Sequence, residues 1–414
     1  MEEMFINCGY KAVPSSEFAD IYVINTCTVT NMAERKSRQM LRRVKEINPT
    51  ATLVVCGCYA QVASKELEEI PEIDIILGIN EKKKIVPIVE NYIENNKKIE
   101  EVSNLTLNSE FIDFGDVTYT EKNRAVVKVQ DGCNMFCTYC IIPYARGRIR
   151  SRKIENVVSE ANKIAKEGIK EIVITGIHVA SYGKDFKDGT TLIDLLEELN
   201  KVDGIERIRL SSLEPTLITE EFAKRLSKLN KICDHFHLSL QSGSDTVLKR
   251  MNRKYTTKRY TESIDILKKY YPEANFTTDI IVGFPGETDA EFDETYQFAK
   301  KINFYKLHVF KYSKRRGTPA EKMPNQIDGN IKEKRSNELI NFSKENDIKI
   351  SQKYIGKTLK VLFEEEKNDF YRGHTTNYII VNAKSKKNIV NEIKKVKIES
   401  INTENGELLG NIED

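Results

Sequence analysis

Short runs of β-branched and apolar residues alternate with longer segments of helical periodicity through the middle of the chain. The short runs cover residues 125–130, 171–175, 207–211, 236–241, 276–282 and 305–312. The helical segments between them lie near 153–167, 191–201, 219–229, 257–271 and 288–301. This alternation predicts βα units around a parallel sheet. Six units predict an open (β/α)6 barrel, three-quarters of an eight-stranded one, with its active site at the carboxyl ends of the strands.

The first hundred residues show the same alternation on a smaller scale. After a brief helical segment at 1–10, apolar runs at 20–25, 52–56 and 73–77 are followed by helical segments at 31–47, 61–69 and 81–95. The pattern predicts a small parallel α/β domain over residues 1–100. Because such a domain ordinarily has a strand before its first helix, we expect that the chain begins one strand late.

The linker and the C-terminal segment do not show this alternation of short apolar runs and helical segments. Residues 96–124 are polar and without periodicity, which predicts a linker. From about residue 351, alternating or β-branched runs at 357–363, 377–382 and 394–401 are separated by glycines. They predict a small all-β barrel. The expected organisation is therefore an α/β domain at 1–100, the partial barrel at 119–350 and a β domain at 351–414.

Composition places the chain among ordinary globular proteins. Its 414 residues are 40% apolar and 31% charged, and no apolar run reaches the length of a membrane span. The N-terminus carries glutamates where a signal peptide would be basic, so we expect a cytoplasmic protein without a membrane partner. The net charge of +3 does not by itself indicate nucleic-acid binding.

Basic residues are nevertheless clustered in the sequence. The clusters are Arg35, Lys36, Arg38, Arg42 and Arg43; Arg146, Arg148, Arg150 and Arg152; and Lys314, Arg315 and Arg316. Each could be a solvated surface or a set of phosphate contacts, and both interpretations stay open.

Three of the eight cysteines form the strongest motif in the chain. Cys133, Cys137 and Cys140 have C-x3-C-x2-C spacing on a polar loop after the first strand of the partial barrel. Grouped cysteines in a reducing compartment favour metal binding or catalysis over disulfides. Three thiolates are one short of a closed zinc site or a filled cubane cluster, which leaves a position for a substrate. Zinc completed by a distant residue and a set of merely buried cysteines are the alternatives.

Two further cysteines follow strands of the first domain. Cys27 and Cys58 lie just past the carboxyl ends of the runs 20–25 and 52–56, where parallel sheets place their chemistry. Cys56 falls within its strand, and Cys8 lies at a helix end. We expect both of these to be core residues.

Small and polar residues follow the other strands of the partial barrel. Glycine lets a ligand approach the backbone, and polar side chains suit a ribose and an amino-acid headgroup. The candidate cofactor-pocket residues are Gly176, Ser212, Glu214, Gln241, Gly283 and Glu287. Glu287 has an alternative role as a charge at the start of the helix near 288–301.

Nearly the whole chain resembles the methylthiotransferases of the radical S-adenosylmethionine (SAM) superfamily. The resemblance rests on Asn25-Thr26-Cys27, on Gly57-Cys58-Tyr59-Ala60-Gln61 and on Asp131-Gly132-Cys133-Asn134-x2-Cys137-x2-Cys140. The stretch from Cys27 to Gln39 is similar to the branch that acts on N6-threonylcarbamoyladenosine at position 37 of tRNA. The C-terminal β segment resembles the RNA-binding TRAM domain.

The resemblance implies a mechanism with two [4Fe–4S] clusters. Cys133, Cys137 and Cys140 would hold one cluster whose open iron binds SAM, with Tyr139 in the cofactor pocket. One electron would then yield a 5′-deoxyadenosyl radical that abstracts hydrogen from C2 of the adenine. Cys27 and Cys58 would hold a second cluster that delivers sulfur. Its third cysteine has no counterpart here, so either the native chain is longer or this cluster is abnormal.

The resemblance also implies partners and leaves competing functions. It implies the tRNA anticodon stem-loop, a reduced electron donor of the flavodoxin or ferredoxin type, a sulfur donor and a monomeric enzyme. Isopentenyladenosine in tRNA and a ribosomal protein are alternative substrates. An RNA-binding protein that has lost catalysis is the alternative of a different class.

Overall fold

The computed structural model describes residues 1–28, 31–105, 110–113, 115 and 123–413. The chain divides into two compact units. The first unit contains Met1–Val117, Asp131–Arg150 and Ser313–Lys322, and the second contains Thr118–Gln130, Ser151–Tyr312 and Met323–Asp414. The loop with the three grouped cysteines therefore belongs to the same unit as the N-terminal sheet.

The first unit is built on a parallel sheet with strand order β1-β2-β3-β4, as predicted for an α/β domain. The strands are β1 (Ile21–Thr26), β2 (Thr52–Gly57), β3 (Ile75–Leu77) and β4 (Ile99–Glu101). The helices are α1 (Glu2–Asn7), α2 (Asn31–Ile47), α3 (Cys58–Val62), α4 (Ser64–Glu68), η1 (Glu81–Lys84), α5 (Ile85–Asn95), α6 (Ile142–Arg146) and η4 (Pro319–Lys322). Every residue of β2 is buried, as expected for a parallel strand covered on both faces.

Three local predictions for this unit were wrong. The segment predicted as one helix at 61–69 forms α3 and α4, which are separated at Ala63 because its φ of −137° is not helical. Within the predicted linker, β4 pairs with β3, while residues 106–109, 114 and 116–122 lie outside the described residues. Cys8 is exposed at the end of α1 rather than packed in the core.

The second unit contains the predicted partial barrel. Each of the six predicted strands is present: β5 (Arg124–Asp131), β7 (Glu171–Gly176), β8 (Arg207–Leu210), β9 (His235–His237), β10 (Asn275–Val282) and β11 (Lys306–Lys311). β5, β7 and β8 pair in parallel, and so do β9, β10 and β11. Parallel bridges from Ile208 to Ile232 and from Leu213 to Leu238 connect the two sets into a curled half-barrel. The short β6 (Arg150–Ser151) extends the sheet beside β5.

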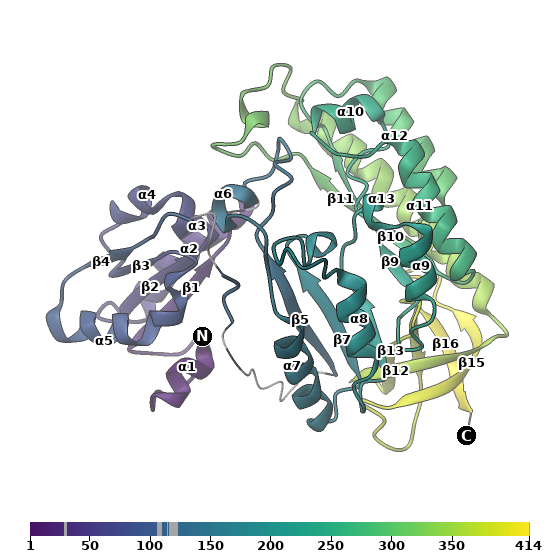
Figure 1. Ribbon diagram of the computed structural model, residues 1–414, viewed down its shortest axis with the longest axis horizontal. Helices are drawn as coiled ribbons and strands as arrows, with labels where there is room; N and C mark the ends of the chain where they lie inside the picture. Colours follow the sequence, from purple (N-terminus) through teal and green to yellow (C-terminus); the bar gives the residue numbers. More distant parts are fainter. Residues whose placement is uncertain (29–30, 106–109, 114, 116–122, 414) are drawn as a thin grey trace. The chain divides into compact units, whose positions relative to one another are not determined.

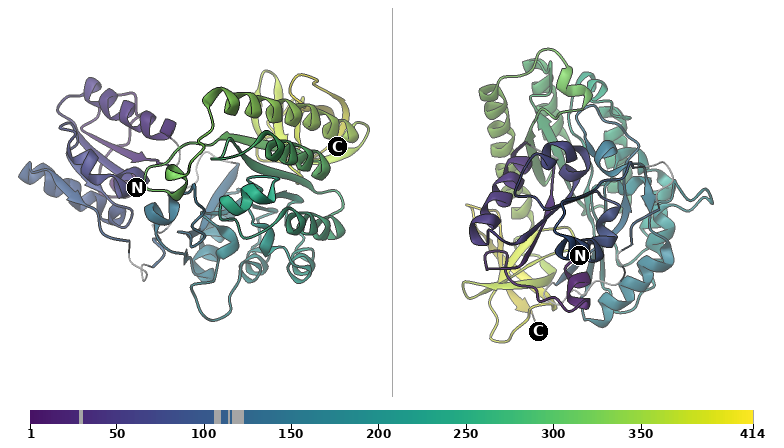
Figure 2. Two further views of the ribbon diagram at one scale, coloured as in Figure 1. Left: turned by 90° about the horizontal axis from the view of Figure 1, so that it is seen from above. Right: turned by 90° about the vertical axis from the view of Figure 1, so that its left-hand side faces the viewer.

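Helices cover the outer side of this half-barrel (Figures 1 and 2). They are α7 (Ile154–Lys166), α8 (Leu192–Asn200), α9 (Glu220–Leu226), α10 (Asp245–Arg250), α11 (Thr257–Tyr270) and α12 (Asp289–Ile302), with η2 (Val179–Ser181) and η3 (Pro215–Leu217) as short turns. In α8, the buried residues include Leu192, Leu195 and Leu199, each worth roughly 1.5–3 kcal/mol when removed from water. A capping box between Thr191 and Asp194 fixes the start of this helix.

The C-terminal segment forms the predicted all-β barrel, closed with strand order β12-β13-β14-β16-β15. Its strands are β12 (Thr358–Lys367), β13 (Phe370–His374), β14 (Ile380–Ala383), β15 (Ile393–Ile401) and β16 (Leu408–Glu413). A long helix, α13 (Gly329–Ser351), and the turn η5 (Gln352–Tyr354) precede it. The sequence pattern did not predict α13, β13 or β16.

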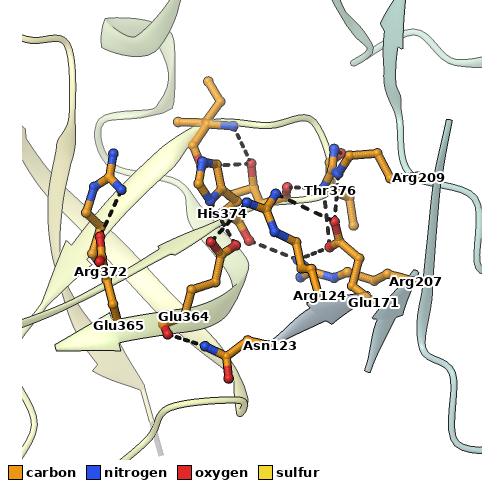
Figure 3. A network of polar contacts seen from close by, with 12 residues as sticks. Asn123, Arg124, Glu171, Arg207, Arg209, Glu364, Glu365, Arg372, His374 and Thr376 are labelled. Atoms are coloured by element: carbon orange, nitrogen blue, oxygen red, sulfur yellow. Dashed lines mark hydrogen bonds and ion pairs between the residues drawn. The ribbon is translucent and has the colours of Figure 1, made fainter. Parts of the chain in front are cut away.

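A buried ionic network attaches this barrel to the amino ends of the half-barrel strands (Figure 3). Glu171, the first residue of β7, is fully buried, and Arg209 Nε lies 2.7 Å from its carboxylate. Arg207 donates to the backbone carbonyls of His374 and Lys360, and Arg209 donates to those of Thr375 and Thr376. The β-barrel therefore lies at the end of the strands opposite to their carboxyl termini. Among the described residues, no helix is long and apolar enough to cross a bilayer.

Candidate active site

The cysteine loop leaves β5 through a turn that only glycine fits. Gly132 has a φ of +71°, and a Cβ at this position would lie 1.8 Å from the carbonyl oxygen of Arg148. The N–H of Cys133 donates to the carbonyl of Gly147 at 3.0 Å, which folds the loop back on itself. The glycine before the first cysteine is therefore required by the close backbone approach.

The three cysteines of this loop are largely shielded from solvent. Cys133 and Cys137 are buried, Cys140 is half-buried, and its N–H donates to the Cys137 carbonyl at 3.0 Å. The N–H of Met135 points at Cys133 Sγ at 3.4 Å. All eight cysteines of the chain are described, and none of them forms a disulfide. No three described His, Cys, Asp or Glu side chains converge closely enough for a single metal ion.

The donor chemistry of this loop fits an iron–sulfur cluster. Thiolates are the ordinary ligands of such clusters, and backbone N–H groups that point at their sulfurs help to set the reduction potential. Cys133, Cys137 and Cys140 supply thiols from one loop, and Met135 supplies such an N–H. Their assignment as the cluster ligands stays a prediction.

Cys27 and Cys58 lie where the sequence predicted, at neighbouring strand ends. Thr26 of β1 pairs with Gly57 of β2, so the two cysteines follow adjacent parallel strands. Gly57 has a φ of +104°, and a Cβ there would lie 2.3 Å from the carbonyl oxygen of Thr26. Cys27 is exposed, whereas Cys58 is buried at the start of α3.

The other two residues of the Asn-Thr-Cys motif hold this edge of the sheet. Thr26 Oγ1 donates to the carbonyl of Cys56 at 2.6 Å, and Lys82 Nζ donates to Asn25 Oδ1 at 2.8 Å. Cys56 is fully buried in the apolar core, as predicted, and burial raises the pKa of its thiol. It is a packing residue rather than a candidate ligand.

Sequence analysis placed Arg146 in a basic cluster but did not predict its contact with a cysteine of the N-terminal sheet. Its Nε lies 3.0 Å from Cys58 Sγ, and its Nη1 lies 3.5 Å from Asp131 Oδ2. Burial opposes the charge of Arg146, but the neighbouring Cys58 and Asp131 raise its pKa above the usual value. The contact joins residues 88 positions apart in the sequence.

At the carboxyl end of the half-barrel, Glu214 lies in a buried polar network. His178 Nε2 is 2.5 Å from its carboxylate, and Arg253 Nη2 is 3.7 Å away. Burial disfavours the carboxylate, but His178 and Arg253 hold the pKa of Glu214 below its usual value. Gln130, at the end of β5, accepts a hydrogen bond from the N–H of His178. Strand ends from β5, β7 and β8 therefore meet here, as the rim prediction required.

The other predicted pocket residues differ in their surroundings. Gly176 packs against Gln130, and Gly283 has a φ of +69°, with Lys332 occupying the space that its Cβ would need. Gln241 is buried, with a φ of +68°. Ser212 is exposed, and Tyr139, in the cysteine loop, is half-buried. Their part in a cofactor pocket stays a prediction.

Glu287 is bound to the neighbouring helix α13. Arg335 Nη1 lies 2.8 Å from its carboxylate, which also accepts a hydrogen bond from the N–H of Gly283 at 3.0 Å. Burial raises the pKa of Glu287, although Arg335 and the N–H of Gly283 both favour its charged form. The cap of α12 is Thr288 with Glu291, so Glu287 lies outside the capping box. Its part in a cofactor pocket stays a prediction.

Two of the four arginines that follow the cysteine loop are buried in the fold. Arg150 is 2% exposed, and Arg152 is buried beside Glu160, to which it is hydrogen-bonded. For these two, the interpretation as a solvated surface was wrong, because both guanidinium groups are buried and paired within the fold. Their contact with phosphate stays a prediction. Arg148 lies over the ring of Phe136, with 4.7 Å between its guanidinium carbon and the ring centre.

A cavity of about 570 Å³ opens beside both cysteine segments of the first unit. Its lining includes Thr28, Tyr59 and Ile141, which directly follow Cys27, Cys58 and Cys140. Most of its remaining lining is polar. The polar residues are Glu34, Gln61, Ser64, Lys65, Glu66 and Arg316. Arg316 is largely exposed and is paired with Glu66.

Known proteins match both cysteine regions. A profile described as the Radical SAM superfamily matches residues 127–299, and one described as uncharacterized protein family UPF0004 matches residues 1–78. The threonylcarbamoyladenosine tRNA methylthiotransferase MtaB of Bacillus subtilis is 43% identical over 402 residues, which are 96% of this chain and 89% of that protein. The chain belongs to the radical SAM methylthiotransferase family.

Relatives within this family carry two different substrate names. The MtaB protein of Aquifex aeolicus is 40% identical and covers 94% of this chain and 93% of its own length. The tRNA-2-methylthio-N(6)-dimethylallyladenosine synthase of Caldicellulosiruptor saccharolyticus is 36% identical over 94% of this chain and 84% of its own length. The family is therefore established, and its members differ in the adenosine substituent.

A solved structure supports the fold of the family. A radical SAM methyltransferase from Kitasatospora setae matches 84% of this chain and 68% of its own, with a TM-score of 0.55 and 14% identity. At this identity the likeness shows the fold alone. Radical SAM enzymes use SAM and a [4Fe–4S] cluster, which agrees with the thiol chemistry of the cysteine loop.

Proposed function

We propose that this protein is a tRNA methylthiotransferase that acts in the cytoplasm. It inserts a methylthio group at C2 of N6-threonylcarbamoyladenosine at position 37. The observation that carries the proposal is the Arg146–Cys58 contact, which brings the loop of the radical SAM cysteines against a cysteine of the N-terminal sheet. Methylthiolation needs a site for hydrogen abstraction and a site for sulfur, and one compact unit contains candidates for both.

The chain's own residues hold and shield these centres. Cys133, Cys137 and Cys140 would bind one cluster, and their burial would keep bulk water away from it. Cys27 and Cys58 would bind a second cluster for the sulfur transfer. With SAM bound, the first centre supplies a radical able to attack an unreactive C–H bond. Reduced flavodoxin or ferredoxin and a sulfur donor complete the set of partners.

Recognition of tRNA is assigned to the C-terminal barrel as a TRAM domain. Its exposed strand residues include Lys360, Lys395 and Lys397, which suit contacts with the phosphates of the anticodon stem. The buried network at Glu171 fixes this barrel to the half-barrel, so a bound stem would be held in a constant relation to the rim.

The polar cavity favours threonylcarbamoyladenosine over isopentenyladenosine. The threonylcarbamoyl group carries a carboxylate, a hydroxyl and a urea, whereas an isopentenyl group has no hydrogen-bonding atoms. A pocket lined by Gln61, Ser64 and Arg316 would leave polar groups without partners around an isopentenyl chain. We assign the carboxylate to Arg316, replacing its pairing with Glu66.

Nucleoside analysis tests the proposed reaction directly. The test uses a strain in which this gene is deleted and no other enzyme of the same activity is present. Its tRNA is digested, and the nucleosides are separated by liquid chromatography and identified by mass spectrometry. We expect loss of 2-methylthio-N6-threonylcarbamoyladenosine and accumulation of its unmethylthiolated precursor. If the modified nucleoside persists, the proposal fails. A methylthio mark missing from a ribosomal protein instead would favour the protein substrate.

A substitution in the cavity tests the substrate assignment. Arg316→Met should lower kcat/KM for threonylcarbamoylated tRNA roughly 10- to 100-fold, because a charge-assisted hydrogen bond is worth about 1.5–3 kcal/mol. SAM cleavage without tRNA should be unchanged. The matched control is Lys314→Met, which removes a nearby exposed cation that does not line the cavity. Equal losses in both variants would contradict a specific role for Arg316.

A further inference from the structure

Arg146 connects the two cysteine regions of the first unit. It ends α6, just after the cysteine loop, and its Nε lies 3.0 Å from Cys58 Sγ. Its Nη1 lies 3.5 Å from Asp131, the last residue before the Gly132 turn into the loop. One guanidinium therefore reaches a sulfur on one side and the base of the cysteine loop on the other.

The position of Arg146 is fixed by its surroundings. Its side chain is 23% exposed, and that of Asp131 is 4% exposed. Arg150 donates to the backbone carbonyl of Arg146 at 2.8 Å and also approaches Asp131 at 3.6 Å. Cys58 packs in an apolar cluster with Ala145, the residue before Arg146. A hydrogen bond in such a partly dry environment is stronger than one in water.

We propose that Arg146 is a positioning residue for the second cluster, where it donates a charged hydrogen bond to the sulfur of Cys58. The inference rests on the proposed function, since it takes Cys58 as a ligand of that cluster. Donors to ligand sulfurs stabilise the more negative reduced cluster and raise its reduction potential. Arg146 thereby sets the potential of the sulfur-delivering centre and ties that centre to the loop of the SAM-binding one.

The test measures the second cluster alone. Replacing Cys133, Cys137 and Cys140 together with alanine leaves Cys27 and Cys58 in the full-length protein. In this background Arg146 is changed to Met, which removes the donor, or to Lys, which keeps the charge without the planar fork. Arg148→Met is the matched control, because it removes a cation of the same segment that stacks on Phe136. After anaerobic reconstitution, iron content and the midpoint potential by electron paramagnetic resonance are measured.

The expected result is a lower potential in the Arg146→Met protein, an intermediate value with lysine and no shift in the Arg148→Met control. Loss of iron only in the methionine variant, with unchanged circular dichroism and with iron retained by the lysine variant, also supports the role. An unchanged potential with full iron in Arg146→Met overturns this inference alone. A background protein without any iron overturns the two-cluster function together with it.

Discussion

Replacing Cys137 with alanine is expected to abolish the cleavage of SAM. A cluster that is to bind SAM must keep three protein ligands and one open iron, and the Cys137 thiol has no substitute nearby on its loop. Formation of 5′-deoxyadenosine under a chemical reductant should fall to the level seen without enzyme. Iron content should fall by the share of one cluster, about half of the total.

Binding of tRNA separates this effect from misfolding. The exposed lysines proposed to contact tRNA lie on the C-terminal barrel, which belongs to the second unit, so the affinity of Cys137→Ala for tRNA should stay close to that of the unchanged protein. Cys8→Ala is the control, because this cysteine is exposed at the end of α1. SAM cleavage retained in Cys137→Ala would refute the assigned cluster site.

Sequence periodicity was sufficient to predict a helix where the helix buries one apolar face. The half-barrel helices bury one mainly apolar face, as Val157, Ala161 and Ile164 do in α7, so the spacing of these residues revealed the helices. The helix α13 was missed for the opposite reason. Its buried face includes Arg335, Ser343, Asn346 and Asp347, and such residues produce no apolar stripe.

The candidate site was predictable where it depends on motifs close together in the chain. Cys27 and Cys58 were placed correctly because parallel strands bring their carboxyl ends to one edge. The partners of buried charges were not predictable. From the sequence, Arg150 and Arg152 could be surface residues, because the sequence does not show that Asp131 and Glu160 pack beside them. The Arg146–Cys58 contact depends on packing between distant segments, which no local pattern contains.

Replacing Glu171 with alanine is expected to lower the free energy of unfolding by about 3–5 kcal/mol, the usual cost of removing one partner from a buried ionic cluster. Its carboxylate lies 2.7 Å from Arg209 and 3.7 Å from Arg207, and it is fully buried. Without it, these cations face each other in a dry interface. Urea denaturation should show the loss, and tRNA affinity should fall because the C-terminal barrel is less firmly held.

A more exposed ion pair in the same region supplies the matched control. Glu365 is 52% exposed and lies 3.1 Å from Arg372, so Glu365→Ala should cost less than about 1 kcal/mol.

Burial opposes ionisation of Glu171, but the arginines hold its pKa below the ordinary value. Its charge therefore stabilises the fold at every pH above the unfolded carboxyl pKa of about 4.3, and this contribution is lost as the pH falls through the lower folded pKa. The stability difference between the unchanged protein and Glu171→Gln should accordingly be constant near neutral pH and shrink only below about pH 4. Equal stability of the Glu171→Ala and Glu365→Ala proteins would show that burial of this network does not govern how the barrel is attached.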